Sequence, residues 1–275
     1  MPEGEGASHR FAELCARLRE YSSVAVAFSG GVDSSLLLSA ALAVHGEQAL
    51  VLHARSPLQA PGEYEKALAL AAGLGCRPTV VEIDPYTWPE FVVNPPDRCY
   101  RCKVRLYNIF QDHARKHDRA VLLDGTNSDD RQSDDRPGLR ALKELKVQTP
   151  LADIGLRKQE VRQLARQRRL ANWHKPAASC LATRIMAGQA ITPERLAVVV
   201  EGEKMLADLG FAGCRFRHYG HKCLLEVGHD DYKRLNKREI VSITDSRCRT
   251  LGFTVVERGK RPQPGKQKET GSFFV

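Results

Sequence analysis

Short apolar runs alternate with amphipathic stretches along the first half of the chain. The apolar runs occupy residues 24–28, 49–54, 79–83 and 120–124. Between them, apolar residues recur at helical spacing over residues 8–20, 34–44, 62–73 and 99–110. Runs this short are typical of strands buried on both faces of a parallel sheet. Their alternation with helices predicts an α/β fold with a doubly wound parallel sheet.

The pattern changes after Thr192. A helix is predicted over residues 194–209, and short alternating strands over residues 215–219, 222–227 and 252–257. We therefore expect two domains and a tail rich in Lys, Gln, Pro and Gly. The predicted parts are a first domain over residues 1–185, a small α+β domain for substrate binding or oligomerisation over 186–258, and a mobile tail over 259–275.

Two polar segments interrupt the first domain. Residues 125–138 are rich in turn residues, which predicts a loop. The basic run from Arg157 to Arg169 carries apolar residues at helical spacing. This spacing predicts an amphipathic helix over residues 158–170, whose basic residues form a solvated face.

The first apolar run stops at Ser29 and is followed by a glycine turn and a helical pattern. Asp33, Ser34 and Ser35 would fall in the first turn of that helix. Helix N-termini present unpaired N–H groups, and glycines let a phosphate approach the backbone. The sequence therefore predicts an anion site here, and it is not a Walker A loop because no Gly-Lys-Ser/Thr follows.

Polar residues end three of the predicted strands. Ser29, His53 and Asp124 would gather at the carboxyl edge of a parallel sheet, which is where such sheets bind ligands.

Composition limits the possible partners. The chain has 275 residues, 42% of them hydrophobic, and a net charge of +9, which favours an anionic partner such as ATP, a nucleotide-like substrate or tRNA. No run of eighteen apolar residues occurs, and the first residues lack the basic and apolar regions of a signal peptide. We expect a cytoplasmic protein with no membrane partner.

Eight cysteines are more consistent with metal ligands, catalysts or free thiols than with disulfides in that compartment. Cys99 and Cys102 have the Cys-x-x-Cys spacing, and Arg98, Arg101 and Lys103 would favour their ionised forms. Cys180 lies about eighty residues further on. Three thiolates around a 4Fe-4S cluster would leave one iron open for an exogenous sulfide, whereas four would close a zinc site or a usual cluster.

The sequence leaves open whether three or four ligands converge. The weaker candidates for a fourth are Cys76, Cys214, Cys223 and Cys248, for which burial as small hydrophobes is the favoured interpretation.

Several motifs together resemble a known family. SGGVDSS (29–35) is similar to the pyrophosphate loop of the PP-loop ATP pyrophosphatases, which cut ATP between the α and β phosphates. With NPPDRCYRCK (94–103), LLDGTNSDD (122–130), DDRPGLRA (134–141) and NWHKPAASCLATRI (172–185), the chain resembles the LarE family of ATP-dependent sulfur transferases. The resemblance spans about residues 10–190 by motif and the second domain more loosely.

The resemblance implies an activity. Members adenylate the carboxylates of pyridinium-3,5-biscarboxylic acid mononucleotide, a small nucleotide, and convert them to the thiocarboxylates of the nickel-pincer nucleotide cofactor. It further implies ATP and Mg²⁺, a sulfide donor and a homo-oligomer. In one branch of the family three cysteines hold a 4Fe-4S cluster that carries the extra sulfide.

The resemblance also assigns site residues. The implied catalytic residues are Cys99, Cys102 and Cys180, which would hold the cluster, and Asp33, which would help to hold magnesium. The implied ATP-binding residues are Ala27, Ser29, Gly30, Gly31, Asp33, Ser34, Ser35, His53, Asp124 and Gly125. The implied groups for the substrate phosphate are Thr183, Arg184, Arg215, Arg217 and Glu203; Arg215 and Arg217 alternate on a predicted strand and so share a face.

Three alternatives remain at this stage. Cys180 could be a sacrificial cysteine that gives up its own sulfur, although it lies one place further along the Lys-Pro stretch than that type has it. A PP-loop tRNA thiolase also fits the charge, but no RNA-binding appendage or basic stripe with aromatics is present, so a nucleic acid partner is not expected. A non-catalytic regulator is disfavoured by the intact Asp33, Ser34 and Ser35.

Overall fold

The computed structural model describes residues 3–119, 121–132, 137–176 and 179–261. The chain divides into two compact units, residues 1–180 and 181–275, and each is described by itself. The division falls after Cys180, whereas the sequence predicted a first domain ending at residue 185. The roles predicted for the two domains stay predictions.

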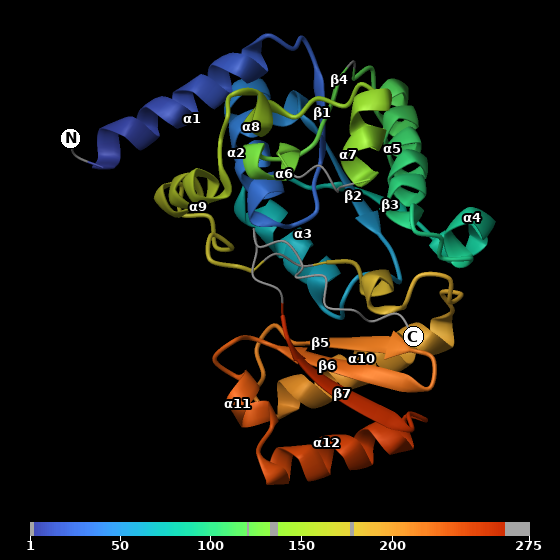
Figure 1. Cartoon of the computed structure of the whole chain (residues 1–275). Coiled ribbons are helices and arrows are strands. Elements are labelled where there is room, and N and C mark those ends of the chain that lie inside the picture. Colours follow the sequence, from blue (N-terminus) through green and yellow to red (C-terminus); the bar gives the residue numbers. More distant parts are fainter. Residues whose placement is uncertain (1–2, 120, 133–136, 177–178, 262–275) are drawn as a thin grey trace. The chain divides into compact units, whose positions relative to one another are not determined.

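The first unit contains a four-stranded, all-parallel sheet in the order β3-β2-β1-β4 (Figure 1). Its strands are β1 (Val24–Ala27), β2 (Leu50–Arg55), β3 (Thr79–Glu82) and β4 (Val121–Leu123). All four residues of β1 are buried, as expected for a central strand with apolar residues on both faces. The predicted parallel α/β fold is confirmed.

Helices lie on both sides of this sheet. They are α1 (Glu3–Arg19), α2 (Val32–His45), α3 (Glu63–Gly73), α4 (Pro89–Val92), α5 (Arg98–Lys116), α6 (Ser128–Arg131), α7 (Pro137–Glu144), α8 (Pro150–Asp153) and α9 (Lys158–Gln167). Helix α2 packs against α1 and α9, while α5 packs against α7 and contacts β1 and β4 (Figure 1).

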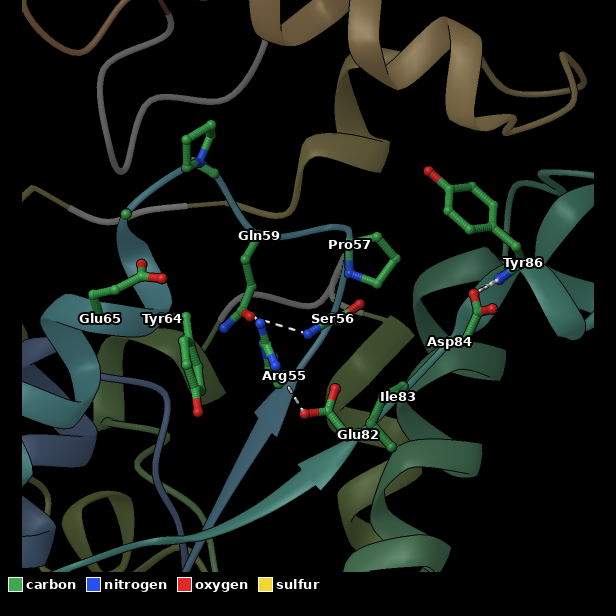
Figure 2. A pocket seen from close by; sticks show the side chains of 13 residues that line it. Arg55, Ser56, Pro57, Gln59, Tyr64, Glu65, Glu82, Ile83, Asp84 and Tyr86 are labelled. Carbon is green, nitrogen blue, oxygen red and sulfur yellow. Dashed lines mark hydrogen bonds and ion pairs between the residues drawn. The ribbon is translucent and has the colours of Figure 1, made fainter.

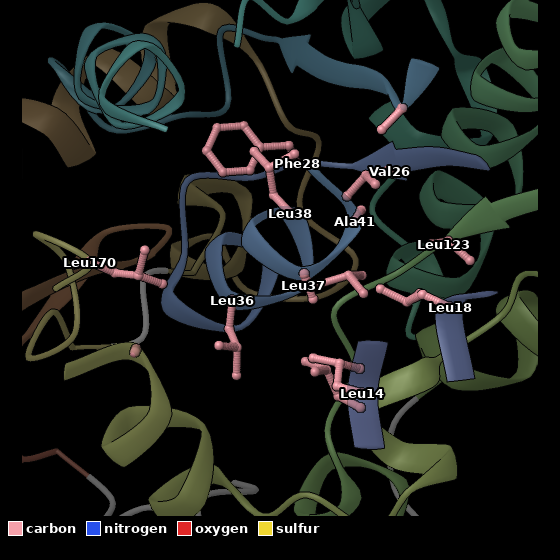
Figure 3. Close-up of a cluster of buried hydrophobic side chains, with 14 of the residues drawn as sticks. Leu14, Leu18, Val26, Phe28, Leu36, Leu37, Leu38, Ala41, Leu123 and Leu170 are labelled. Atoms are coloured by element: carbon pink, nitrogen blue, oxygen red, sulfur yellow. The ribbon is translucent and has the colours of Figure 1, made fainter. Parts of the chain in front are cut away.

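The core of the first unit surrounds α2, whose residues are apolar on all sides. Leu36, Leu37 and Leu38 are fully buried and belong to the same hydrophobic cluster as Leu14 and Leu18 of α1 (Figure 3). Burying one leucine side chain stabilises a fold by roughly 1.5–3 kcal/mol. This packing fixes the position at which α2 begins, directly after the predicted anion loop.

The segment predicted as a loop over residues 125–138 contains helix. Asn127 caps α6 because its side chain accepts from the Asp130 N–H, at 3.1 Å, and the Asp130 carboxylate accepts from the Asn127 N–H. Helix α7 begins at Pro137, a favoured first position. The loop prediction was wrong there because the polar, turn-like composition gave no sign of either helix start. Residues 133–136 lie outside the described residues.

The second unit is a small α+β domain with strand order β5-β6-β7. Its elements are a 3-10 turn (Leu181–Arg184), α10 (Pro193–Asp208), β5 (Arg215–Tyr219), β6 (Lys222–Val227), α11 (Tyr232–Leu235), α12 (Arg238–Thr250) and β7 (Val255–Lys260). Strand β6 is antiparallel to β5 and parallel to β7. Strand β7 includes residues 259 and 260 of the predicted tail, and residues 262–275 lie outside the described residues.

No helix in the described ranges is long and apolar enough to cross a membrane.

Candidate functional site

The turn between β1 and α2 has the geometry of an anion-binding loop. Gly30 has φ +75°, and a Cβ there would lie 2.8 Å from the Cβ of Ala67. Gly31 is the N-cap residue of α2 and supplies no side-chain cap. The helix therefore begins two residues earlier than predicted, with backbone N–H groups of its first turn left for a ligand.

The loop serines brace the turn. The Ser29 N–H donates to Ser34 Oγ at 3.2 Å, and Ser34 Oγ donates to the Gly31 carbonyl at 3.1 Å. Ser35 is buried, and its Oγ accepts from Asn172 Nδ2 at 2.9 Å. Asn172 also donates to the Gly30 carbonyl at 3.1 Å. Ser35 and the Gly30 carbonyl are thus joined through Asn172, which stabilises the conformation of the loop.

Asp33 lies in the first turn of α2 and points to two donors. Asn127 Nδ2 donates to one carboxylate oxygen at 3.1 Å, and Lys158 Nζ forms an ion pair with the other. Gly125 lies against the same helix turn, because a Cβ there would be 2.8 Å from the Ser34 nitrogen. The end of β4 and the start of α9 therefore meet the loop at Asp33.

A cavity of about 790 Å³ opens beside this loop, between the carboxyl ends of the strands and α5. Its lining includes most of the predicted ATP-binding residues: Ala27, Ser29, Gly31, Asp33, Ser34, His53, Asp124 and Gly125. The lining does not include the predicted residues Gly30 and Ser35. The three predicted cysteines Cys99, Cys102 and Cys180 line the same cavity.

Asp124 follows β4 and is held in a polar network. Its carboxylate accepts from the Thr126 N–H at 2.8 Å and from the Tyr107 hydroxyl. Burial, and then the Asp124 carboxylate, raise the pKa of Tyr107 well above its usual value, so Tyr107 stays a donor. Lys103 Nζ lies 3.8 Å from Asp124 and carries a positive charge into the cavity.

His53 is a buried residue of β2. Its Nδ1 is 2.8 Å from the Phe28 carbonyl, and burial lowers its pKa, so the ring is neutral at pH 7. The side chain lines the cavity and stabilises the end of β1, which gives it a positioning function.

The cysteines come from two places in the first unit. Cys99 and Cys102 lie in the first turns of α5, and Cys180 follows the NWHKPAAS stretch. Burial first, and then Cys180 and Cys99, raise the pKa of Cys102 to about 12, against the lowering effect of Arg98 and Lys103. Cys102 therefore lies within electrostatic range of both Cys99 and Cys180.

Arg98 and Lys103 favour ionisation of Cys102, as predicted, but they lower its pKa by less than burial raises it. Arg101 is turned to Asp97, at 2.9 Å, and Arg98 lies 3.7 Å from Cys99 Sγ. Burial outweighs the remaining cations at Cys102. The thiol is therefore protonated at neutral pH until a ligand displaces the proton.

The second unit holds a separate cluster of arginines. Arg184 is buried and donates to Glu203 at 2.6 Å, and Arg217 donates to Glu226 at 2.7 Å and to the Thr183 carbonyl at 3.2 Å. Glu203 would therefore act on a phosphate only through Arg184.

Arg215 shares a face of β5 with Arg217, and no residue in the described part of the chain forms an ion pair with it. Burial first, and then the like charges of Arg261, Arg184 and Arg217, lower the pKa of Arg215 to about 10. A half-buried guanidinium among like charges is a position where an anion would be stabilised.

A second hollow, of about 610 Å³, lies at the ends of β2 and β3. Arg55 lines this hollow and forms an ion pair with Glu82 (Figure 2). Its Nη1 lies 3.2 Å from Glu82 Oε1, and its guanidinium lies 4.7 Å from the centre of the Tyr64 ring. The ion pair is solvent-exposed, so its net contribution to stability is small.

Three residues of the site were not predicted from the sequence: Asn127, Lys158 and Asn172. Asn127 and Asn172 lie inside motifs that carried the family resemblance, which was the available signal. Lys158 is one of many basic residues on the predicted solvated face, so nothing in the sequence distinguished it from its neighbours.

Comparisons with known proteins give relatives over most of the chain. The chain is 33% identical over 249 residues, 89% of its length and 88% of the relative's, to the pyridinium-3,5-bisthiocarboxylic acid mononucleotide synthase of Lactiplantibacillus plantarum. It is 38% identical over 202 residues (74% of the chain, 75% of the relative) to an uncharacterised protein of Synechocystis sp.. It is 31% identical over 216 residues (78% and 82%) to an uncharacterised protein of Methanocaldococcus jannaschii. No family model matches the chain.

Proposed function

The chain belongs to the family of the pyridinium-3,5-bisthiocarboxylic acid mononucleotide synthase, the LarE family, and on this premise we propose that it catalyses the same synthesis. It would adenylate the carboxylates of pyridinium-3,5-biscarboxylic acid mononucleotide with ATP and replace the activated oxygen by sulfur. The observation that carries the proposal is that an anion loop and three cysteines line one cavity of about 790 Å³.

The ATP step uses the start of α2. A carboxylate oxygen of the substrate attacks the α phosphorus, the bond to the bridging α–β oxygen breaks, and pyrophosphate leaves while AMP stays on the carboxylate. The backbone N–H groups in the first turn of α2, after Gly31, would stabilise the charge on the pyrophosphate. Asp33 offers a carboxylate at the loop, which suits Mg²⁺ because that ion binds through one or two carboxylates together with substrate phosphates.

The sulfur step needs a nucleophile that the cysteines can hold. Across the described ranges no group of three His, Cys, Asp or Glu side chains lies close enough for a single metal ion. Three thiols that line one cavity nevertheless suit a four-iron cluster, whose ligands lie further apart than those of one ion. When bound, such a cluster supplies an iron open to an exogenous sulfide. The chain's own contribution is to bring Cys99, Cys102 and Cys180 beside the loop.

The arginines of the second unit would hold the phosphate of the mononucleotide. We predict that Arg215→Gln raises the KM for the mononucleotide about 10- to 100-fold with little change in kcat, because a ground-state phosphate contact is lost. Steady-state kinetics with varied mononucleotide measure this. Arg247→Gln, at an exposed position of α12, should leave KM unchanged; an equal KM in both variants would remove Arg215 from the phosphate site.

Incubation with ATP, Mg²⁺, sulfide and the biscarboxylic mononucleotide under anaerobic conditions tests the proposal. Mass spectrometry should detect thiocarboxylate product and AMP in step with each other. AMP formation that requires tRNA in place of the mononucleotide would establish the tRNA thiolase alternative. Product limited to one sulfur per chain, with sulfur lost from Cys180, would establish the sacrificial-cysteine alternative.

A further inference from the structure

Lys158 forms an ion pair with the one carboxylate that the anion loop presents. Its Nζ contacts Asp33 Oδ2, while Asn127 occupies Oδ1 at 3.1 Å. Asp33 lies in the first turn of α2 and lines the cavity. The ammonium of Lys158 is therefore at the edge of the place where a pyrophosphate would bind.

The backbone of Lys158 is fixed although its side chain is not enclosed. Lys158 is the first residue of α9, and its N–H donates to Asp129 Oδ2 at 2.9 Å. The side chains of Lys158 and Asp33 are 29% and 21% exposed. A four-carbon stem on a fixed base can move its ammonium by several ångströms without any change in the fold.

The ammonium of Lys158 and a divalent cation compete for the same carboxylate oxygen of Asp33. A carboxylate oxygen that accepts from an ammonium is not available to coordinate Mg²⁺, which requires near-octahedral oxygen ligands. The ammonium, once released, is a strong donor for a phosphate oxygen a short distance away. Without the ammonium, the negative charge of Asp33, which lines the cavity, would repel an incoming triphosphate.

We propose that Lys158 is a phosphate-binding residue that exchanges partners. It neutralises Asp33 before the nucleotide arrives, and it donates to the pyrophosphate portion of ATP when a divalent cation takes the Asp33 oxygen. The inference rests on the proposed function, because it takes the loop as the site of the departing pyrophosphate.

This role differs from that of an ordinary structural ion pair in the sign of one effect, the change in divalent-cation affinity when the lysine is removed. Loss of a structural pair that holds the loop would weaken the binding of anions and of divalent cations alike. Loss of an exchanging lysine weakens anion binding but frees Asp33, so that a divalent cation binds more tightly.

Lys158→Met is the test, with Lys158→Arg to restore the charge. Pyrophosphate binding is measured by calorimetry at a saturating concentration of Mg²⁺, and Mn²⁺ binding is measured by electron paramagnetic resonance without nucleotide. We expect Lys158→Met to bind pyrophosphate about 10- to 100-fold more weakly and Mn²⁺ several-fold more tightly. Lys158→Arg should recover most of the pyrophosphate affinity. Lys222→Met, which breaks the 3.0 Å pair with Glu257 in the second unit, is the matched control and should change neither.

Unchanged pyrophosphate affinity in Lys158→Met, or weaker binding of both ligands, would overturn the inference. Failure of the wild-type protein to bind pyrophosphate or to form AMP would instead refute the proposed function. Circular dichroism of each variant verifies that it is folded.

Discussion

Asp33→Asn is expected to lower AMP and pyrophosphate formation by about a thousandfold. The substitution keeps the size of the side chain and the hydrogen bond to Asn127 within reach, but it removes the charge that a magnesium ion would use at the loop. Loss of metal-assisted stabilisation of a leaving phosphate amounts to several kcal/mol, and each 1.36 kcal/mol is about tenfold in rate. Release of pyrophosphate from radiolabelled ATP measures the effect.

The fold should survive this change. The Asp33–Lys158 pair is partly exposed, so its loss lowers the free energy of unfolding by less than about 1 kcal/mol. Asp153→Asn is the matched control, since Asp153 has a similar exposed fraction and an arginine partner at 2.6 Å but lies outside the cavity lining. Comparable rates for the two variants would show that Asp33 has no part in the chemistry.

The sequence predicted the first unit well where local signals agree. The apolar run at Val24, the glycine turn and the apolar helix after Val32 all favour one structure, and the structure has it. The predictions were wrong where polar composition was the only signal. Helix α6 and the first two residues of α7 lie in a segment predicted as a loop, because a capping asparagine and an initial proline are also common in turns.

The site was predictable in its residue types but not in its partners. The carboxyl ends of parallel strands must share one edge, so Ser29, His53 and Asp124 could be placed together from the sequence. Contacts between distant elements could not. The pairing of Asp33 with Lys158 depends on how α9 packs against α2, and the buried residues of α9 that set this packing, such as Val161 and Ala165, do not identify Asp33 as the partner of Lys158.

The same distinction applies to ionisation. Three basic residues near Cys99 and Cys102 suggested thiolates, but charge near a group in sequence says little about its burial. In the structure burial dominates, and it raises the pKa of Cys102 to about 12. Loading of iron must therefore displace a proton from Cys102, and it should become more favourable as pH rises from neutral toward that pKa.

Cys102→Ala is expected to abolish iron binding. We predict about four irons and about four acid-labile sulfides per wild-type chain after anaerobic reconstitution, with absorption near 400 nm, and almost none in the variant. Cys102 is the most enclosed of the three thiols and interacts electrostatically with both others. Its removal therefore leaves only the two exposed thiols of Cys99 and Cys180 as cluster ligands. Cys76→Ala is the control, because Cys76 is a partly buried thiol of the same unit that bonds the Ala71 carbonyl outside the cavity.

The outcome decides how sulfur reaches the substrate. Iron retained in Cys76→Ala and lost in Cys102→Ala would mean that the cavity holds a renewable carrier, and many thiocarboxylates per chain would then be possible. Iron absent from the wild type, together with conversion of Cys180 to dehydroalanine after turnover, would contradict the cluster. In that case each chain would act once, and Cys99 and Cys102 would serve to shape the cavity beside the loop.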